Sequence, residues 1–476
     1  MKTFIKEHLT YFECLIYGLL SGSVIGFLIK KGIALSPDSI NYLSIAKIIN
    51  VGKLSEAFVT IWPPFFPMLI ALINSFGFEG EKSAQIISVI SYSTLVLIMF
   101  LLANATAGKL VAHFTSFSML FFAPLLFVYN YLWSETVFIT LSSISLLFLD
   151  RFLKSTNTRK SYVHLIWGGV FTGLAFLTRY AGVALFLAGL TIVGFKDGMK
   201  IYTRKIKFLL LFCLIACTPI TLYLVGCLYY GGKSIPSSDH VITSLWQNFG
   251  LFFTTIYHDF FTFALNFPGY MITWHPNAPI QILGKIAGSI FIILGLLYIT
   301  TQLFKKTTEN QTVLFIYISC YSLFIIVIST VRYRTLVESR LCSPIYPFII
   351  VLIFLGVTAI CRNFAHRKTK LLFWIPSILA VLLFWFIQSG SSVNVFKRKQ
   401  PEKMTKIEQK DITGDGVFDV SDIMVLTHYL YRNGPQPSPL QNANVNCDDT
   451  INIADVVYLV NYVYKNGPPP CNYRGH

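Results

Sequence analysis

Long apolar stretches recur along the first 390 residues of the chain, separated by short polar turns. Examples are Ser83–Ala105, Ile206–Leu228, Ile282–Leu303 and Leu371–Ile387. Each is long enough to cross a hydrocarbon core of about 30 Å as a helix, which satisfies its own backbone hydrogen bonds in lipid. The pattern therefore predicts a mainly α fold: a polytopic bundle of about eleven transmembrane helices in a multi-pass integral membrane protein.

Composition changes sharply near residue 400. The chain of 476 residues is 54% hydrophobic and 13% charged, about half the charged share of a soluble domain. Residues 1–399 carry 32 Lys and Arg against 13 Asp and Glu, whereas residues 400–476 carry 6 against 9. The positive net charge of the chain, +16, thus comes from the membrane part, since the tail has more acids than bases, and it indicates contact with anionic lipid, not with nucleic acid. We expect a membrane domain over residues 1–390, a linker over 391–408 and a small polar domain over 409–476.

The distribution of basic residues predicts the topology. With the N-terminus inside, before an uncleaved first helix over Tyr11–Ile29, basic clusters should face inward. They do so only if Ile61–Phe76, which holds three prolines in its first turns, does not fully cross the membrane. This assignment places the C-terminal domain outside, although Lys397–Lys399 follow the last helix on that side. The four clusters are Arg151–Lys160, Lys196–Lys207, Lys305–Lys306 and Arg362–Lys370.

The polar tail contains a repeated, oxygen-rich loop. Residues 411–422 (DITGDGVFDVSD) and 444–455 (NVNCDDTINIAD) are offset by 33 positions. Oxygen-bearing side chains occupy loop positions 1, 3, 5, 9 and 12, and the backbone carbonyl of position 7 completes the ligand spacing of an EF-hand-type calcium loop. The predicted calcium ligands are Asp411, Thr413, Asp415, Val417, Asp419 and Asp422, then Asn444, Asn446, Asp448, Thr450, Asn452 and Asp455.

The two loops are not equivalent. Gly416 supplies the sharp turn at position 6 of the first loop, whereas Asp449 replaces it in the second, so we expect the second calcium site to be weaker. One short amphipathic helix follows each loop and ends at Asn-Gly-Pro. Cys447 and Cys471 are an even pair in the tail and would form a disulfide in an oxidising space.

This duplicated loop and helix over about 65 residues resembles type I dockerin repeats. The resemblance implies a calcium-dependent module that docks onto cohesin domains. A different cell-surface contact is the alternative partner.

The outer face of the membrane part contains few acids. The candidates there are Asp38, Glu56, Glu79, Glu81, Glu135, Asp239, Asp259 and Glu338. Asp38 follows the first helix, with Tyr42 one turn on, and Glu135 opens a helix in WSETVF. Three basic residues near the same boundary are Arg179, Arg332 and Arg340. A metal site at His240, His258 and Asp259 lacks a tight spacing motif.

The order of these features over residues 10–350 resembles the GT-C membrane glycosyltransferases, the class of the family 39 protein mannosyltransferases and lipid-A aminoarabinose transferases. The matching pieces are Asp38 with Tyr42, PPFFPML, the acid opening a helix, GLAFLTR and RLCSPIYP. The resemblance implies transfer of a hexosyl or pentosyl group from a polyprenyl-phosphate carrier to a glycan, lipid or protein acceptor, as in polysaccharide metabolism of the cell envelope.

The resemblance also implies residue roles. Asp38 would take the proton of the acceptor hydroxyl, and Glu135 would assist or share a divalent metal with it. Arg340, with Arg179 or Arg332, would bind the lipid phosphate, and Tyr42 would line the substrate site. As alternatives, the acids would cap helices and the arginines would bind lipid head groups.

Two other functions compete with sugar transfer. A transporter or flippase of lipid-linked glycans predicts charged pairs within the membrane and inverted repeats, and neither is evident in the sequence. A membrane anchor that displays the dockerin-like module would need a single helix, not eleven.

Overall fold

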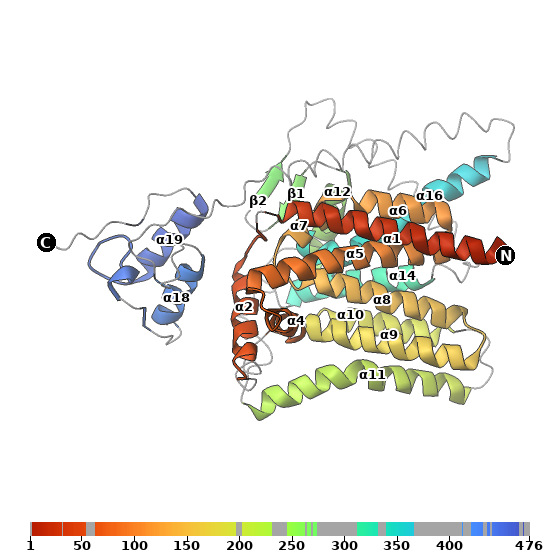
Figure 1. The fold of residues 1–476 in the computed structure, drawn as a ribbon, viewed down its shortest axis with the longest axis horizontal. Coiled ribbons are helices and arrows are strands. Elements are labelled where there is room, and N and C mark those ends of the chain that lie inside the picture. The colour runs from red at the N-terminus through yellow and green to blue at the C-terminus, as the bar shows by residue number, and fades with distance from the viewer. Residues whose placement is uncertain are drawn as a thin grey trace. The chain divides into compact units, whose positions relative to one another are not determined.

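The structure is a computed structural model whose described residues form two compact units. It describes residues 2–30, 32–53, 62–196, 202–230, 245–261, 264–267, 270–273, 312–331, 339–365, 412, 420–431, 436–437, 440–465 and 470. The first unit comprises Met1–Ile33 and Tyr42–Lys397, and the second comprises Ala34–Asn41 and Arg398–His476. The fold is mainly helical, as predicted (Figure 1).

Five long helices of the first unit pack side by side in the order α1, α5, α8, α9 and α11 (Figure 1). Their bounds are Lys2–Leu28, Gly80–Ala107, Glu135–Lys154, Thr158–Thr178 and Tyr202–Tyr229. Two further long helices, α14 (Thr312–Val331) and α16 (Tyr346–Ala365), complete the set of apolar helices long enough to span a bilayer.

The described residues thus contain seven candidate spans. An eighth is the pair α6 (Lys109–Met119) and α7 (Ala123–Asn130), which is bent by 53° at the break between them. Two of the predicted crossings, Ile282–Leu303 and Leu371–Ile387, lie outside the described residues. The structure confirms a polytopic bundle, and the total of eleven stays a prediction.

The helix of the proline-bearing segment is too short to span a bilayer by itself, which is consistent with the expected topology. This helix, α4, covers Phe65–Asn74, ten residues or about 15 Å at 1.5 Å per residue. That is half of the hydrocarbon thickness. Proline cannot donate a backbone hydrogen bond, so Pro63 and Pro64 precede the helix and Pro67 lies in its first turn.

Shorter elements complete the first unit. They are α2 (Pro37–Asn50, which begins in the second unit), α10 (Gly182–Gly194), α12 (Leu245–Phe261), α15 (Ser339–Cys342) and the 3₁₀ turn η2 (Ser343–Ile345). A hairpin pairs β1 (Ala264–Phe267) with β2 (Tyr270–Thr273), with Phe267 opposite Tyr270. This hairpin follows α12 in the chain.

The end of the bundle where α8 ends is basic, and Lys196 binds the C-terminus of α8 there. Its Nζ donates to the carbonyl oxygens of Phe152 and Ser155, the latter at 2.9 Å. Such carbonyls are free acceptors at the C-terminus of a helix. Burial lowers the pKa of Lys196 to about 8. Two predicted inner clusters, Arg151–Lys160 and Lys196–Lys207, meet at this end.

An ion pair between α1 and α6 differs from the expectation that the helices carry no charged pairs. Nζ of Lys109, at the start of α6, lies 2.9 Å from Oε1 of Glu13 in α1. His113 of α6 lies 3.6 Å from the other oxygen of Glu13. The sequence pattern does not reveal this ion pair, because Glu13 and Lys109 are about 100 positions apart.

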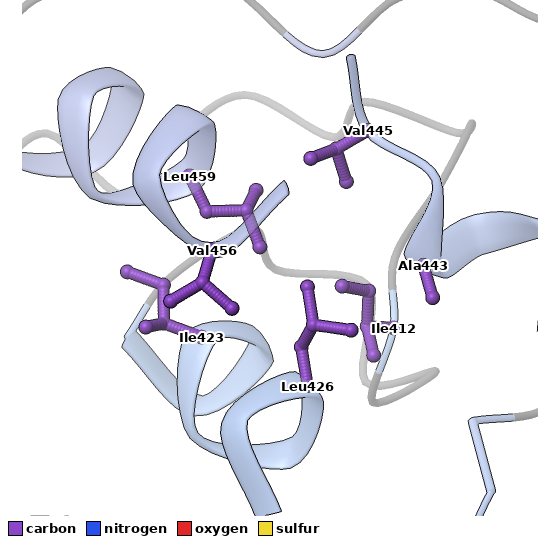
Figure 2. Packing of buried hydrophobic residues seen from close by; sticks show 7 residues of the cluster. All are labelled: Ile412, Ile423, Leu426, Ala443, Val445, Val456 and Leu459. Carbon is purple, nitrogen blue, oxygen red and sulfur yellow. The ribbon is translucent and has the colours of Figure 1, made fainter. Parts of the chain in front are cut away.

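The second unit packs two short helices around a small apolar core. Helix α18 covers Val420–Tyr431, α19 covers Ile453–Lys465, and the 3₁₀ turn η3 covers Leu440–Ala443. Figure 2 shows the side chains that meet between them. They are Ile412, Ile423, Leu426, Ala443, Val445, Val456 and Leu459. The predicted apolar faces of the two helices are therefore buried against each other.

Candidate functional site

Three turns that lie far apart in sequence meet at the start of α8. Glu135, the first residue of that helix, is 1% exposed. Its Oε2 lies 2.6 Å from Nη1 of Arg179, which follows α9, and 3.3 Å from Nη2 of Arg340 in α15. Nε of Arg340 also contacts Oε1 of Glu135. The Glu135 carboxylate therefore lies between two of the three predicted arginines. We call Glu135, Arg179 and Arg340 the charged triplet.

An aromatic ring fixes the second face of Arg340. The guanidinium carbon lies 4.2 Å from the ring centroid of Trp133, a cation–π contact. Trp133 in turn stacks on Tyr131, with centroids 4.4 Å apart and planes at 17°. Arg340 is thus held between a carboxylate and an indole.

Ser134 links the triplet to the predicted substrate-binding tyrosine. Its hydroxyl accepts a hydrogen bond from Nη1 of Arg179 at 3.1 Å and shares one with the hydroxyl of Tyr42 at 3.0 Å. Tyr42 is 1% exposed and packs edge-on against Trp62 and Phe66. These contacts connect α2 and the proline-rich turn with the charged site.

A glycine explains how Arg179 reaches this position. A Cβ on Gly182, at the start of α10, would lie 2.4 Å from the backbone Cα of Phe176. Only glycine therefore permits α10 to fold back so tightly against the end of α9. The turn between these helices carries Arg179.

The triplet combines partial access with fixed charge. The Arg179 and Arg340 side chains are 20% and 16% exposed, whereas that of Glu135 is 1% exposed. Guanidinium groups bind the oxygens of a phosphate in pairs. Two such groups with one carboxylate sum to one positive charge, and the N-terminus of α8 adds a favourable field for an anion.

The remaining predicted membrane residues are only partly described. Asp38 is half-buried in the first turn of α2, four residues before Tyr42, so both face the same side of that helix. Arg332 lies outside the described residues. Among the residues that the structure describes, no group of three or more His, Cys, Asp and Glu side chains is placed to hold a metal ion. A shared catalytic metal therefore stays untested.

The sequence pattern missed three participants. Trp133 and Ser134 directly precede the predicted Glu135, and that adjacency is the signal that would have found them. Asp259, one of the outer acids, accepts hydrogen bonds from Ser339 and Tyr346. No local pattern marks it, because its partners lie 80 and 87 positions away.

In the second unit, hydrogen bonds link the polar side chains of the loop 444–455. Oδ1 of Asp448 accepts hydrogen bonds from the backbone and the hydroxyl of Thr450, at 2.9 and 2.8 Å. Asn446 donates to Oδ2 of Asp448, and Asn452 donates to Thr450. Hydrogen bonds from Thr450, followed by that from Asn446, lower the pKa of Asp448, which keeps its carboxylate ionised. Clustered hard oxygens of this kind suit calcium.

The aspartate at position 12 of each loop accepts a hydrogen bond from the backbone N–H of position 2 of the same loop. Oδ1 of Asp422 accepts the backbone N–H of Ile412 at 2.9 Å, and Oδ1 of Asp455 accepts that of Val445 at 2.8 Å. Both aspartates are fully buried. The rest of the first loop, including Asp411, Thr413, Asp415, Val417 and Asp419, lies outside the described residues.

Two residues of the second loop adopt left-handed backbone conformations. Cys447 has φ 58° and Asp449 has φ 64°. In the first loop the equivalent positions are Gly414 and Gly416. The structure thus agrees with the expected strain at Asp449 and adds a second strained position at Cys447.

Cys447 is disulfide-bonded. Its predicted partner, Cys471, lies outside the described residues, so the pairing stays a prediction.

Comparison with known proteins defines both units. Residues 62–223 match the family described as dolichyl-phosphate-mannose-protein mannosyltransferase, and residues 409–464 match the dockerin type I domain. No curated protein sequence matches the chain.

Solved structures share the fold of the membrane part. Apo ArnT from Cupriavidus metallidurans superposes with a TM-score of 0.52 at 13% identity, covering 80% of this chain and 76% of that one. The oligosaccharyltransferase AglB from Archaeoglobus fulgidus gives a TM-score of 0.53 at 13% identity, covering 86% of this chain and 59% of the enzyme. This chain thus spans about three fifths of AglB.

The membrane part therefore shares the fold of ArnT and AglB, and seven helices among the described residues are long and apolar enough to cross a membrane. Within the chain, residues 62–223 are similar to the mannosyltransferase family and residues 409–464 to type I dockerin domains.

Proposed function

We propose that the membrane part transfers a sugar from a polyprenyl-phosphate donor to an acceptor hydroxyl on the outer face. The carrying observation is the Glu135 carboxylate held between Arg179 and Arg340. Its surplus positive charge suits the phosphate of the leaving group, and the partial exposure of both arginines leaves them accessible.

The proposed reaction divides the work among the chain's own residues. The acceptor oxygen forms a bond to the anomeric carbon while the bond from that carbon to the phosphate oxygen breaks. Arg179 and Arg340, with Arg332 as a third candidate, bind the polyprenyl phosphate that leaves with the electron pair. Asp38 takes the proton of the acceptor. Both oxygens of Glu135 are engaged in ion pairs, so its proposed role is to orient the arginines.

Two of the structures with this fold support the carrier. ArnT is known bound to undecaprenyl phosphate, and AglB in complex with an inhibitory peptide and a dolichol-phosphate. A charged site that binds a polyprenyl phosphate is consistent with the triplet at the start of α8.

A transfer assay in proteoliposomes tests this function. Purified protein should transfer radiolabelled sugar from polyprenyl-phosphate sugars to an acceptor, and Asp38→Ala should lower the rate by about a hundredfold or more. Glu79→Ala is a matched control, because Glu79 is an exposed acid whose side chain caps no helix. A wild-type rate in Asp38→Ala would remove Asp38 from the mechanism.

The same preparation tests the competing flippase. Transport would move the lipid-linked glycan across the vesicle membrane without any new glycosidic bond. Among the described residues, α1 and α6 are joined by the ion pair of Glu13 with Lys109, in which Lys109 is the first residue of α6. Labelled donor that changes leaflet but is never consumed would favour that alternative.

For the tail we propose two calcium sites, at the twelve predicted ligands of residues 411–422 and 444–455, in a domain over 409–476. The hydrogen bonds that hold the side chains of Asp448, Thr450 and Asn452 together support the second site. A cohesin-like protein is the proposed partner. Native mass spectrometry of the full-length protein should count two bound calcium ions, and a count of zero would contradict the proposal.

We further propose that the dockerin domain lies outside the cell membrane. Two inner basic clusters gather at the Lys196 end of the bundle, and the triplet lies at the opposite end of α8. External protease should remove residues 400–476 from intact cells. Protection of the tail in intact cells, with cleavage after lysis, would reverse the assignment.

A further inference from the structure

One buried carboxylate binds both ends of the segment that carries Arg340. The hydroxyl of Ser339, the residue before Arg340, donates to Oδ1 of Asp259 at 2.8 Å. The hydroxyl of Tyr346 donates to Oδ2 of the same side chain. Asp259 is 1% exposed, and both partners are fully buried. The two oxygens of Asp259 therefore join the first residue of α15 to the first residue of α16.

The surroundings of Asp259 fix the direction of its carboxylate. Helix α12, which carries it, packs against α14 and α15. Nδ2 of Asn248 in α12 donates to Oγ1 of Thr330 in α14 at 3.2 Å. Phe260 packs edge-on against the ring of Tyr346, with centroids 5.4 Å apart. Asp259 therefore projects from a helix that is held on both sides of it.

Arg340 lies between the two residues that Asp259 binds. The hydroxyl of Ser343 donates to the carbonyl oxygen of Arg340 at 2.7 Å, which closes the turn between α15 and α16. The guanidinium then reaches Glu135 and Trp133. Because a charged group misplaced by about 1 Å can lose about a hundredfold in rate, the position of this segment matters.

Burial makes a carboxylate a costly choice for a purely structural contact. A carboxylate withdrawn from water costs more free energy than a neutral acceptor would. It offers in exchange two acceptor atoms at a fixed spacing, which a single hydroxyl or carbonyl does not. That property is what holding two hydroxyls on either side of one arginine requires.

We propose that Asp259 is a positioning residue: by binding Ser339 and Tyr346 it sets the place of Arg340 for the donor phosphate, without touching the substrate. This inference rests on the proposed function, in which Arg340 binds that phosphate. It adds to the proposed site a residue of helix α12.

The test compares Asp259→Ala, Asp259→Asn and the matched control Asp150→Asn in the full-length protein in nanodiscs. Asp150 is equally buried and ion-paired with Lys154, but it lies at the opposite end of α8. Binding of undecaprenyl phosphate is measured by titration. Asp259→Ala should weaken binding about tenfold, and Asp150→Asn less than twofold. Asp259→Asn should stay near wild type, because an amide can still meet both hydroxyls.

A double variant separates positioning from general damage. If Asp259 acts through Arg340, the variant with both Asp259→Ala and Arg340→Ala should bind no more weakly than Arg340→Ala alone. In the transfer assay the donor KM should rise more than kcat falls. Additive losses in the double variant, or equal losses in Asp259→Ala and Asp150→Asn, would overturn the proposal.

Hydrogen exchange distinguishes failure of this inference from failure of the proposed function. Asp259→Ala should speed amide exchange over residues 339–346 while leaving residues 136–150 protected as in the wild type. Wild-type protein that binds no undecaprenyl phosphate would refute the proposed function, and with it the phosphate role of Arg340. Unchanged exchange over 339–346 would refute the positioning role, whatever the phosphate does.

Discussion

The two units each contain a site centred on carboxylates, and the sites satisfy those charges in opposite ways. In the membrane part, Glu135 is buried and both of its oxygens meet guanidinium groups of the same chain. In the dockerin loop, Asp448 is exposed, and its oxygens meet neutral donors from Thr450 and Asn446.

This difference indicates what each site is prepared to bind. The charged triplet already contains its cations, so its surplus charge attracts an anion. The oxygens of Asp448 in the loop meet neutral donors, which suits a metal ion that arrives from solution. A count of acids alone would not distinguish the two sites, whereas the partners of each carboxylate do.

The largest expected effect comes from removing the charge of Glu135. In Glu135→Gln a neutral amide faces two arginines, and breaking a buried pair costs about 3 to 5 kcal/mol. We expect more than a hundredfold loss of kcat/KM for the donor and a lower melting temperature. The transfer assay and thermal unfolding measure both. Asp150→Asn, at the other end of α8, should spare the rate, and a fully active Glu135→Gln would show that the arginines need no counter-charge.

Calcium removal should have the next largest effect, confined to the dockerin unit. At calcium a hundredfold above Kd, each site stabilises the folded unit by about 2.7 kcal/mol. A chelator should therefore make residues 409–476 sensitive to protease while the membrane part stays intact. Asp455→Ala should remove the calcium effect of the second loop only. Equal protease resistance with and without chelator would mean that the loops need no metal.

A smaller effect is expected from exchanging the residues at loop position 6. Asp449→Gly should relieve the left-handed conformation and tighten calcium binding in the second loop by about 1 kcal/mol, or about fivefold. The measurement is a calcium titration in an Asp422→Ala background, in which the first loop no longer binds calcium. The reciprocal Gly416→Asp should weaken the first loop by a similar factor. Identical affinities before and after exchange would show that backbone strain does not set the difference.

The smallest expected effect comes from the aromatic contact of Arg340. Trp133→Leu keeps an apolar side chain but removes the ring face, which contributes about 0.5 to 1 kcal/mol in such contacts. The donor KM should rise about threefold with kcat nearly unchanged. Phe171→Leu, a ring change on the neighbouring helix α9, is the control and should leave KM unaltered. A Trp133→Leu chain with wild-type KM would leave Glu135 as the contact that fixes Arg340.

Sequence reasoning found the helical fold because apolar length and proline position are local signals. The same holds for α4, where the prolines explain why the helix begins only at Phe65 and has ten residues. It also placed Glu135, Arg179 and Arg340 on one face, because charge distribution predicts topology. Their contacts did not follow from it, since Glu135 and Arg340 are 205 positions apart and the pairing depends on how α15 packs.

In the second calcium loop, the spacing rule of EF-hand-type loops predicts one of the two left-handed positions and misses the other. The strain at Asp449 followed from the glycine at position 6 of the first loop. The strain at Cys447 could have been predicted in the same way from Gly414, but the loop rule assigns no glycine to position 4. Asp259 was identified only as an acid of the outer face, because its role depends on two hydroxyls that the sequence does not mark.

The stack of Tyr131, Trp133 and Arg340 also gives the site an optical reporter. An indole in contact with a guanidinium, and 5% exposed to water, emits light from surroundings that change when that cation turns toward an anion. The difference between the emission spectra of the wild type and Trp133→Leu should therefore follow donor binding directly. The chain thus contains its own fluorescent probe for a step that otherwise requires a radiolabelled lipid.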